Sequence, residues 1–358
     1  MRVVLAVLLS TSLLAACGGG GSDAGGTSAP LLVINASNQQ AVGRATATAS
    51  TALVGAGGGV SGVNSTEGGA SALSVSRASG ALPGASLSAV ALYLAHALDN
   101  STGGQRSALS ASRTGGSARA LAVAPVTELC TLSGSFTLGL VDSDNSGSAT
   151  LGDTLTLTFN HCQDSATESV NGVMSITFSQ ISMPSGLLSF TGSLAMQSLT
   201  VADGARTAVL NGGLVMDLAQ LSSSQTRVGM TVGGSGLSAS VTGAGVSESI
   251  GFDAGFAISI TETVATTVGG IDSATATLNG SFTASSIGGR VQLNTTVPML
   301  QLASENYPRA GVLKVQGNSS ALRLTALDAT TARLELDANL DGTYESSTDM
   351  AWTTLLPG

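Results

Sequence analysis

The sequence predicts a mainly β fold, in which an antiparallel meander forms a large curved sheet, a sandwich or a partly open barrel after a small N-terminal region of helices and loops. Apolar and polar residues alternate in many short runs, which is the period of a half-buried strand. The 358 residues include 47 glycines and only 10% are charged, a composition that suits exported β proteins better than cytosolic enzymes. A five-residue pattern of apolar, polar, Gly, small and apolar residues recurs at 132–136, 170–174, 190–194, 210–214 and 278–282, and glycine within a strand marks a bend or a close approach of backbones.

Residues 1–16 have the pattern of a secretory signal. Arg2 is followed by an apolar run that ends in Leu-Ala-Ala before Cys17, and this run is too short to span a bilayer. The Leu-Ala-Ala-Cys sequence resembles the lipobox of bacterial lipoproteins, which implies cleavage before Cys17 and acylation of its thiol and amino group. Gly18 stands where enterobacterial lipoproteins retained in the inner membrane carry aspartate. The resemblance therefore implies a lipid anchor in the outer membrane, on the periplasmic face or the cell surface.

Residues 17–29 form the lipidated Cys and a flexible Gly/Ser tether, which cannot build a core. Residues 30–125 are interpreted as short helices and loops, partly of low complexity. Ser37 and Gln40 match a capping box ahead of an Ala-rich helix, and a second helix is predicted over residues 87–98. His96 lies in this second helix without a further ligand nearby, so we expect a surface or packing role. The antiparallel β domain is predicted over 126–358.

A hairpin flanked by two cysteines opens the β domain. Residues 132–140 and 154–159 both alternate, and matching their apolar faces places Phe136 opposite Phe159. This register sets Cys162 opposite Ser133 rather than Cys130, so a disulfide needs a shifted register, a bulge, or strands that end before the cysteines. We still predict a Cys130–Cys162 disulfide, because these are the two thiols that remain in an exported chain once the lipobox cysteine is acylated.

Two acidic, glycine-containing turns separate predicted strands, at 142–153 and 337–348. In both turns acids alternate with small residues ahead of a glycine, which aims several oxygens at one hard cation. The turns resemble the calcium loops of EF-hands and dockerins, although strands rather than helices flank them. That resemblance implies Ca²⁺ and assigns as ligands Asp142, Asp144, Ser146, Ser148 and Asp153, with Thr150 acting through water, and Asp337, Asn339, Asp341, Thr343 and Glu345. The second turn is the weaker match because its twelfth residue is a threonine, and a plain solvated turn is the alternative for both.

Charge and motifs exclude several function classes. A net charge of −9 with 13 scattered basic residues argues against binding to nucleic acid. No nucleophile elbow, zinc-protease helix, phosphate loop or dinucleotide fingerprint occurs in a supporting context. We therefore predict that the protein is not an enzyme.

The lipobox, the tether, the cysteine-flanked acidic hairpin and the final acidic loop together resemble a group of uncharacterised lipoproteins of proteobacteria, a resemblance that implies architecture but no activity. The leading prediction is a lipid-anchored, non-catalytic structural or interaction module of the cell envelope with calcium-stabilised loops. The alternatives are a periplasmic or surface carrier that holds an apolar ligand within a curved sheet, and a surface adhesin. An accessible apolar interior would favour the carrier, whereas a core filled by side chains would favour the structural module.

Overall fold

The computed structural model describes the N-terminal helix and the β-rich body of the chain. Residues 1–28 and 58–120 are outside the described part, so the predicted signal, Cys17 and the predicted helix at 87–98 with His96 all lie outside it. The described residues are 29–57, 121–130, 132–144, 150–163, 168–182, 187, 189–203, 206–222, 224–243, 246–264, 271–302, 305 and 307–356.

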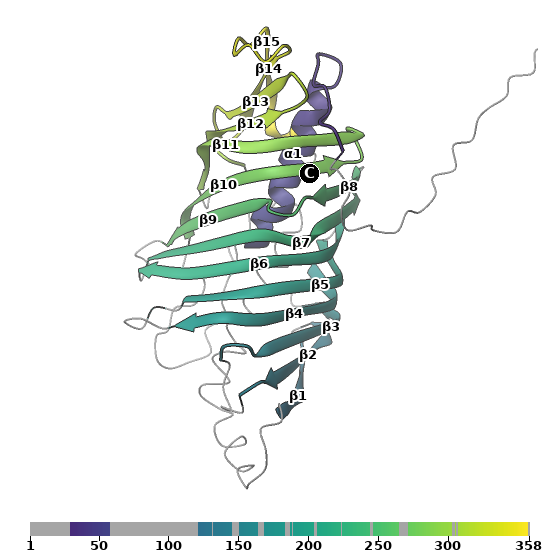
Figure 1. Cartoon of the computed structure of the whole chain (residues 1–358), viewed down its shortest axis with the longest axis vertical. Helices are drawn as coiled ribbons and strands as arrows, with labels where there is room; N and C mark the ends of the chain where they lie inside the picture. Colours follow the sequence, from purple (N-terminus) through teal and green to yellow (C-terminus); the bar gives the residue numbers. More distant parts are fainter. Residues whose placement is uncertain are drawn as a thin grey trace, which may run out of the picture.

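Fifteen strands form one antiparallel sheet, which confirms the predicted fold class (Figure 1). Buried residues alternate with less buried ones along most strands, as in residues 310–316, where Gly311, Leu313 and Val315 are the buried ones. The strands are β1 (Leu121–Leu129), β2 (Ser133–Asp142), β3 (Thr154–Gln163), β4 (Glu168–Ser182), β5 (Ser189–Asp203), β6 (Arg206–Ser222), β7 (Gln225–Gly243), β8 (Val246–Phe252), β9 (Ala257–Val264), β10 (Ile271–Ala284), β11 (Gly289–Leu302), β12 (Ala310–Gln316), β13 (Ala321–Ala326), β14 (Thr331–Asp337) and β15 (Ser346–Ala351).

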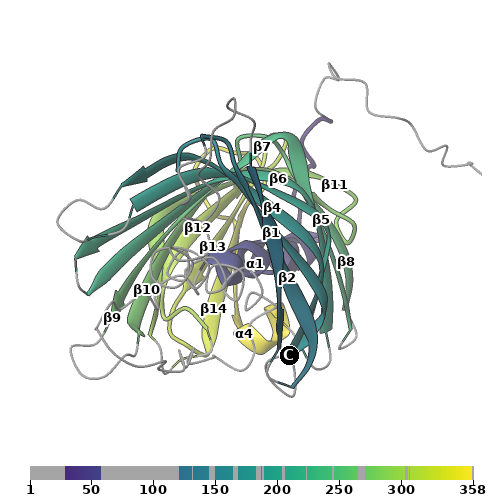
Figure 2. The same cartoon turned by 90° about the horizontal axis from the view of Figure 1, so that it is seen from below.

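Strand order follows chain order with one exception. The long strand β7 pairs with β9 along its first half and with β8 along its second half, and both of these strands then pair with β10. The path runs from β1 at one end to β15 at the other. The sheet curves strongly and encloses the helix α1 on its concave side (Figure 2).

A series of bulges accompanies this curvature. Pairing shifts by one or more residues between β2 and β3, between each later pair up to β6 and β7, and again beside β11. Four of the five glycines of the recurrent pattern, at 134, 172, 212 and 280, have positive φ, and the fifth, Gly192, does not. Gly134, Gly172 and Gly212 lie at register shifts, as expected for glycine at a bulge. Gly280 pairs in regular register with Leu293.

Gly172 shows why the bulges need glycine. Its φ is +116°, and a Cβ there would meet the carbonyl of Ser198 and lie 2.9 Å from the Cα of Leu199. Ser198 is the extra residue of β5 and has φ 48°, and its amide donates to Oδ1 of Asn211 over 2.7 Å. The side chain of Asn211 thus accepts a hydrogen bond from a backbone N–H that, because of the bulge, is not paired with the neighbouring strand.

The helix α1 (Gln39–Gly57) lies on the concave side of the sheet, next to strands from β7 to β14. It contacts β7, β9, β10, β13, β14 and the short helix α4 (Trp352–Leu355). Buried residues occur all round its described part, and most are small, which is typical of an enclosed helix. Within this crowded space Thr46 donates its hydroxyl to the carbonyl of Val42 over 2.8 Å. Among the described residues, no helix has the length and hydropathy to cross a membrane.

The predicted disulfide joins Cys130 to Cys162, with Cα atoms 5.4 Å apart. The predicted register is also confirmed, because Phe136 pairs with Phe159. The bulge between Ser133 and Ser135 pairs Ser133 with Gln163, so it does not bring Cys162 opposite Cys130. Cys130 instead lies before β2, in the turn after β1, where its amide donates to the carbonyl of Gly134 over 3.2 Å. Of the three routes left open by the sequence, the one that operates is a strand that ends before its cysteine.

The two edge strands differ from the rest of the sheet. Pairing of β1 with β2 is interrupted between Val123 and Val126, where Pro125 lies. The edge strand β15 is polar and largely exposed, and its Asp349 forms an ion pair of 2.6 Å with Arg333. Neither edge offers a long, flat, apolar strand.

Candidate metal centres

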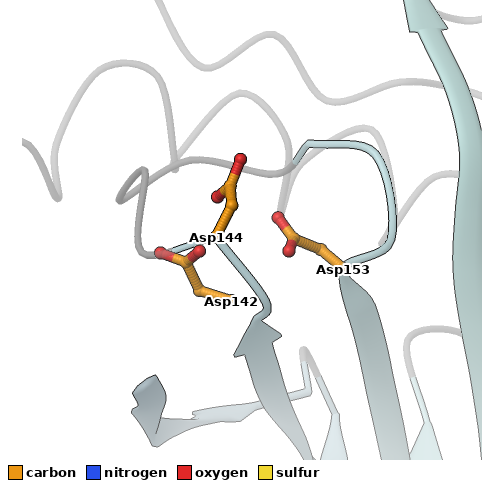
Figure 3. A group of neighbouring side chains, drawn as sticks. All are labelled: Asp142, Asp144 and Asp153. Carbon is orange, nitrogen blue, oxygen red and sulfur yellow. The ribbon is translucent and has the colours of Figure 1, made fainter. Parts of the chain in front are cut away.

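The first acidic loop joins β2 to β3 and gathers three carboxylates. Asp142 ends β2 and is buried, Asp153 directly precedes β3 and is fully buried, and Asp144 is exposed in the loop between them (Figure 3). One carboxylate oxygen from each lies within 4.8 Å of the others. Of the other predicted ligands, Ser146 and Ser148 lie outside the described residues.

Hydrogen bonds already occupy Asp153. Its Oδ1 accepts from the amide and the hydroxyl of Ser143 over 2.7 and 2.8 Å. Its Oδ2 accepts from the amide of Thr150 over 2.7 Å and lies 3.0 Å from the Thr150 hydroxyl, which is also 3.0 Å from Asp144. A carboxylate has about four lone-pair positions, so three or four are in use. Asp153 therefore holds the loop together in this arrangement, and it can bind an ion only if Ser143 or Thr150 turns away.

The second acidic loop joins β14 to β15 and is described completely. Asp337, buried at the end of β14, brings its carboxylate to within 4.8 Å of Asp341 and Glu345. Its Oδ1 accepts from the amide of Asp341 over 3.2 Å and its Oδ2 from the amide of Gly342 over 3.0 Å. Gly342 has φ +90°, which lets the chain reverse around this carboxylate.

The remaining predicted ligands of the second loop are held in place by hydrogen bonds within the loop. Asn339 accepts the amide of Asp341 and donates its own side-chain amide to the Asp341 carboxylate, both over 3.0 Å. The amide of Thr343 donates to Oδ1 of Asp341 over 2.7 Å. These hydrogen bonds, with the Thr343 amide first, hold the pKa of Asp341 below its ordinary value. Glu345 accepts the amide of Ala338 through Oε2 over 2.8 Å.

The two loops differ in how many hydrogen bonds their buried aspartates already accept. Each carboxylate oxygen of Asp337 accepts one hydrogen bond in the second loop, so a lone pair stays available on each. Asp341 accepts from the amide of Thr343 and the side chain of Asn339, and the side chain of Thr343 adds a third hydrogen bond. Ca²⁺ binds oxygens at about 2.3–2.6 Å, so two oxygens on opposite sides of one ion lie about 5 Å apart. The oxygen cluster, within 4.8 Å, fits that span. The geometry thus ranks the second loop above the first, the reverse of the ranking from the sequence.

Each loop is anchored to its surroundings. In the first loop, the backbone of Asp153 accepts the amide of Phe178 on β4 over 3.0 Å. In the second, the guanidinium of Arg323 lies 4.1 Å above the ring of Tyr344. Ser346, next to Glu345, donates to the side chain of Gln39 at the start of α1 over 3.3 Å. The loops close the hairpins β2–β3 and β14–β15, which lie near opposite ends of the strand order.

Sequence reasoning missed the part that Ser143 plays, and it assigned Thr150 a water-mediated contact with an ion. Both residues donate a backbone amide and a hydroxyl to Asp153, and the water-mediated contact of Thr150 stays a prediction. Serine and threonine are common in every polar turn of this chain, so their types alone did not single them out.

Comparisons give no relative from which a function can be transferred. No family model, curated protein or solved structure matches this chain. The case for a metal ion at either carboxylate cluster therefore rests on the geometry of that cluster.

Proposed function

We propose that the protein is a lipid-anchored, non-catalytic β module of the cell envelope, whose acidic loops bind Ca²⁺ and stabilise hairpins near the two ends of its sheet. The carboxylate cluster of Asp337, Asp341 and Glu345 is the observation that supports this function most directly. Its ligands are oxygens only, which suits a hard cation. The ion would neutralise acids that otherwise repel one another and would tie the end of β14 to the start of β15.

The position of α1 supports a structural module over a carrier. Side chains of α1 such as Val42, Ala45 and Ala49 are fully or almost fully buried, and they belong to the same core as Ile260 of β9 and Leu334 of β14. A carrier for an apolar ligand needs an accessible apolar interior, and the helix occupies the part of the concave side that lies next to β7, β9, β10, β13 and β14.

The calcium proposal is tested by the thermal midpoint of the mature chain, with Ca²⁺ and with chelator. A ligand that binds only the native state at 100 times its dissociation constant adds about 2.7 kcal/mol of stability. We expect Ca²⁺ to raise the midpoint of the wild type but not that of Asp341→Asn. The matched control is Asp328→Asn, because Asp328 also accepts backbone amides in a turn, those of Thr330 and Thr331, but lies outside both clusters.

The outcomes separate the loops. No calcium response in the wild type overturns the calcium proposal. A response that survives Asp341→Asn and disappears in Asp144→Asn assigns the ion to the first loop instead. Isothermal titration of the wild type with Ca²⁺ then gives the number of ions bound.

The lipid anchor is tested separately at Cys17. We expect wild-type cells to incorporate labelled palmitate into the protein and to retain it in the membrane fraction. The Cys17→Ser variant should lose both properties. A labelled Cys17→Ser protein in the membrane fraction would exclude this cysteine as the lipidation site.

A further inference from the structure

One acidic side chain lies inside the fold, apart from both carboxylate clusters. Glu262 is on β9 and is 1% exposed. It follows Ile258 and Ile260 on the buried face of the strand, the side to which α1 packs. Its Oε2 is buried without a hydrogen-bond partner, and an unpaired buried carboxylate is costly.

The surroundings of Glu262 supply no positive charge among the described side chains. On β7 its cross-strand neighbour is Thr226, and on β10 it is Ala274. The one charged residue of α1, Arg44, is exposed. Arg227 of β7 is exposed and pairs with Asp217 at 3.5 Å. The one charged residue of β10 is the acidic Asp272, whose side chain lies outside the described part.

We propose that Glu262 is an internal proton-binding site that couples the packing of α1 against β7 and β9 to pH. While the carboxyl keeps its proton, it is neutral and the apolar interior tolerates it. When the O–H bond breaks, the proton leaves to water and a carboxylate remains on the buried face of β9, a strand that α1 contacts. The helix then separates from the strands so that water can reach the charge.

The pKa of Glu262 is consistent with its burial. Burial raises its pKa from 4.5 to about 8. The folded state therefore binds the proton more tightly than an opened state does, so alkali favours opening. Between about pH 4.5 and 8, the equilibrium constant for an opening that hydrates Glu262 increases tenfold for each pH unit. Below that range the carboxyl is neutral in both states, and above it the effect stops increasing.

Amide hydrogen exchange of the whole mature chain tests the proposal, in chelator between pH 5 and 9. After correction for base catalysis, we expect protection of the α1 amides to fall about tenfold per pH unit up to about pH 8. The fall should be absent in Glu262→Gln and in Glu262→Met. Glu248→Gln is the matched control, because Glu248 is buried but accepts hydrogen bonds from Ser285 and Ser286, and it should behave as the wild type.

Two results would overturn the coupling. One is an equal loss of protection in α1 and in all strands, which would tie Glu262 to global unfolding only. The other is a fall that persists in both Glu262 variants. A carbon-detected titration of the wild-type Glu262 carboxyl provides a check that needs no substitution, and a midpoint near pH 4.5 would also overturn the proposal.

Discussion

Replacing Gly172 by alanine tests whether glycines at the bulges set the curvature of the sheet. Gly172 has φ +116°, which alanine rarely adopts, and the added Cβ would lie 2.9 Å from the Cα of Leu199. Backbone strain of this kind costs about 1–3 kcal/mol, and overlap with fixed backbone costs about 1–3 kcal/mol more. We therefore expect Gly172→Ala to lower the free energy of unfolding by about 2–6 kcal/mol, out of about 5–15 kcal/mol for a typical domain.

Urea denaturation of the mature chain measures this loss. At a slope of about 3 kcal/mol per molar urea, the midpoint should fall by about 0.7–2 M. Gly139→Ala is the matched control, because Gly139 lies on β2 of the same sheet and a Cβ there meets nothing within 4 Å. It should be neutral or slightly stabilising, by up to about 1 kcal/mol. Equal midpoints for the two variants would refute the role of Gly172.

Three further predictions concern the disulfide, the bulge asparagine and the second acidic loop. The double variant Cys130→Ser, Cys162→Ser opens a link across a sequence separation of 32 and should lose about 3–4 kcal/mol; reductant should produce the same shift in the wild type and none in the variant. Asn211→Ala leaves the Ser198 amide at the bulge of β5 with only water as an acceptor. Urea denaturation should show a loss of about 0.5–1.5 kcal/mol in the free energy of unfolding. Because hydrogen bonds led by the Thr343 amide lower the pKa of Asp341 below 3.8, its stabilising effect is present above pH 3.8 and is lost as pH falls through the lowered value. In chelator, thermal midpoints between pH 5 and 2.5 should therefore fall more for the wild type than for Asp341→Asn, and parallel curves would contradict this.

Alternation of side chains was sufficient to predict the sheet and one register. Phe136 pairs with Phe159 because matching apolar faces leaves only one phase for the two strands. The recurrent glycine pattern correctly predicted bends, but not the role of the asparagine before glycine. Asn171 and Asn211 each accept a backbone amide from the strand before them, over 3.3 and 2.7 Å. Such contacts join strands, so a pattern within one strand does not reveal them.

Two features were not predicted from the sequence because they depend on tertiary contacts. The start of α1 differs from the predicted capping box, because Ser37 donates its hydroxyl to Asn35 over 2.6 Å and α1 begins at Gln39. The buried position of Glu262 was visible as the third member of an alternating series after Ile258 and Ile260. The alternation does not show that α1 packs against β9. Without the helix, an acid at a strand end is solvated.

The proline in β1 has a consequence for how the molecule meets its own copies. An open sheet ends in two rows of backbone donors and acceptors, and a long regular row can recruit a strand from another molecule. Pro125 removes one donor from the β1 edge, within the interruption between Val123 and Val126. At the other edge, β15 is short and carries Asp349. Both edges therefore discourage the addition of a strand from another copy, so each sheet keeps the length that one chain encodes.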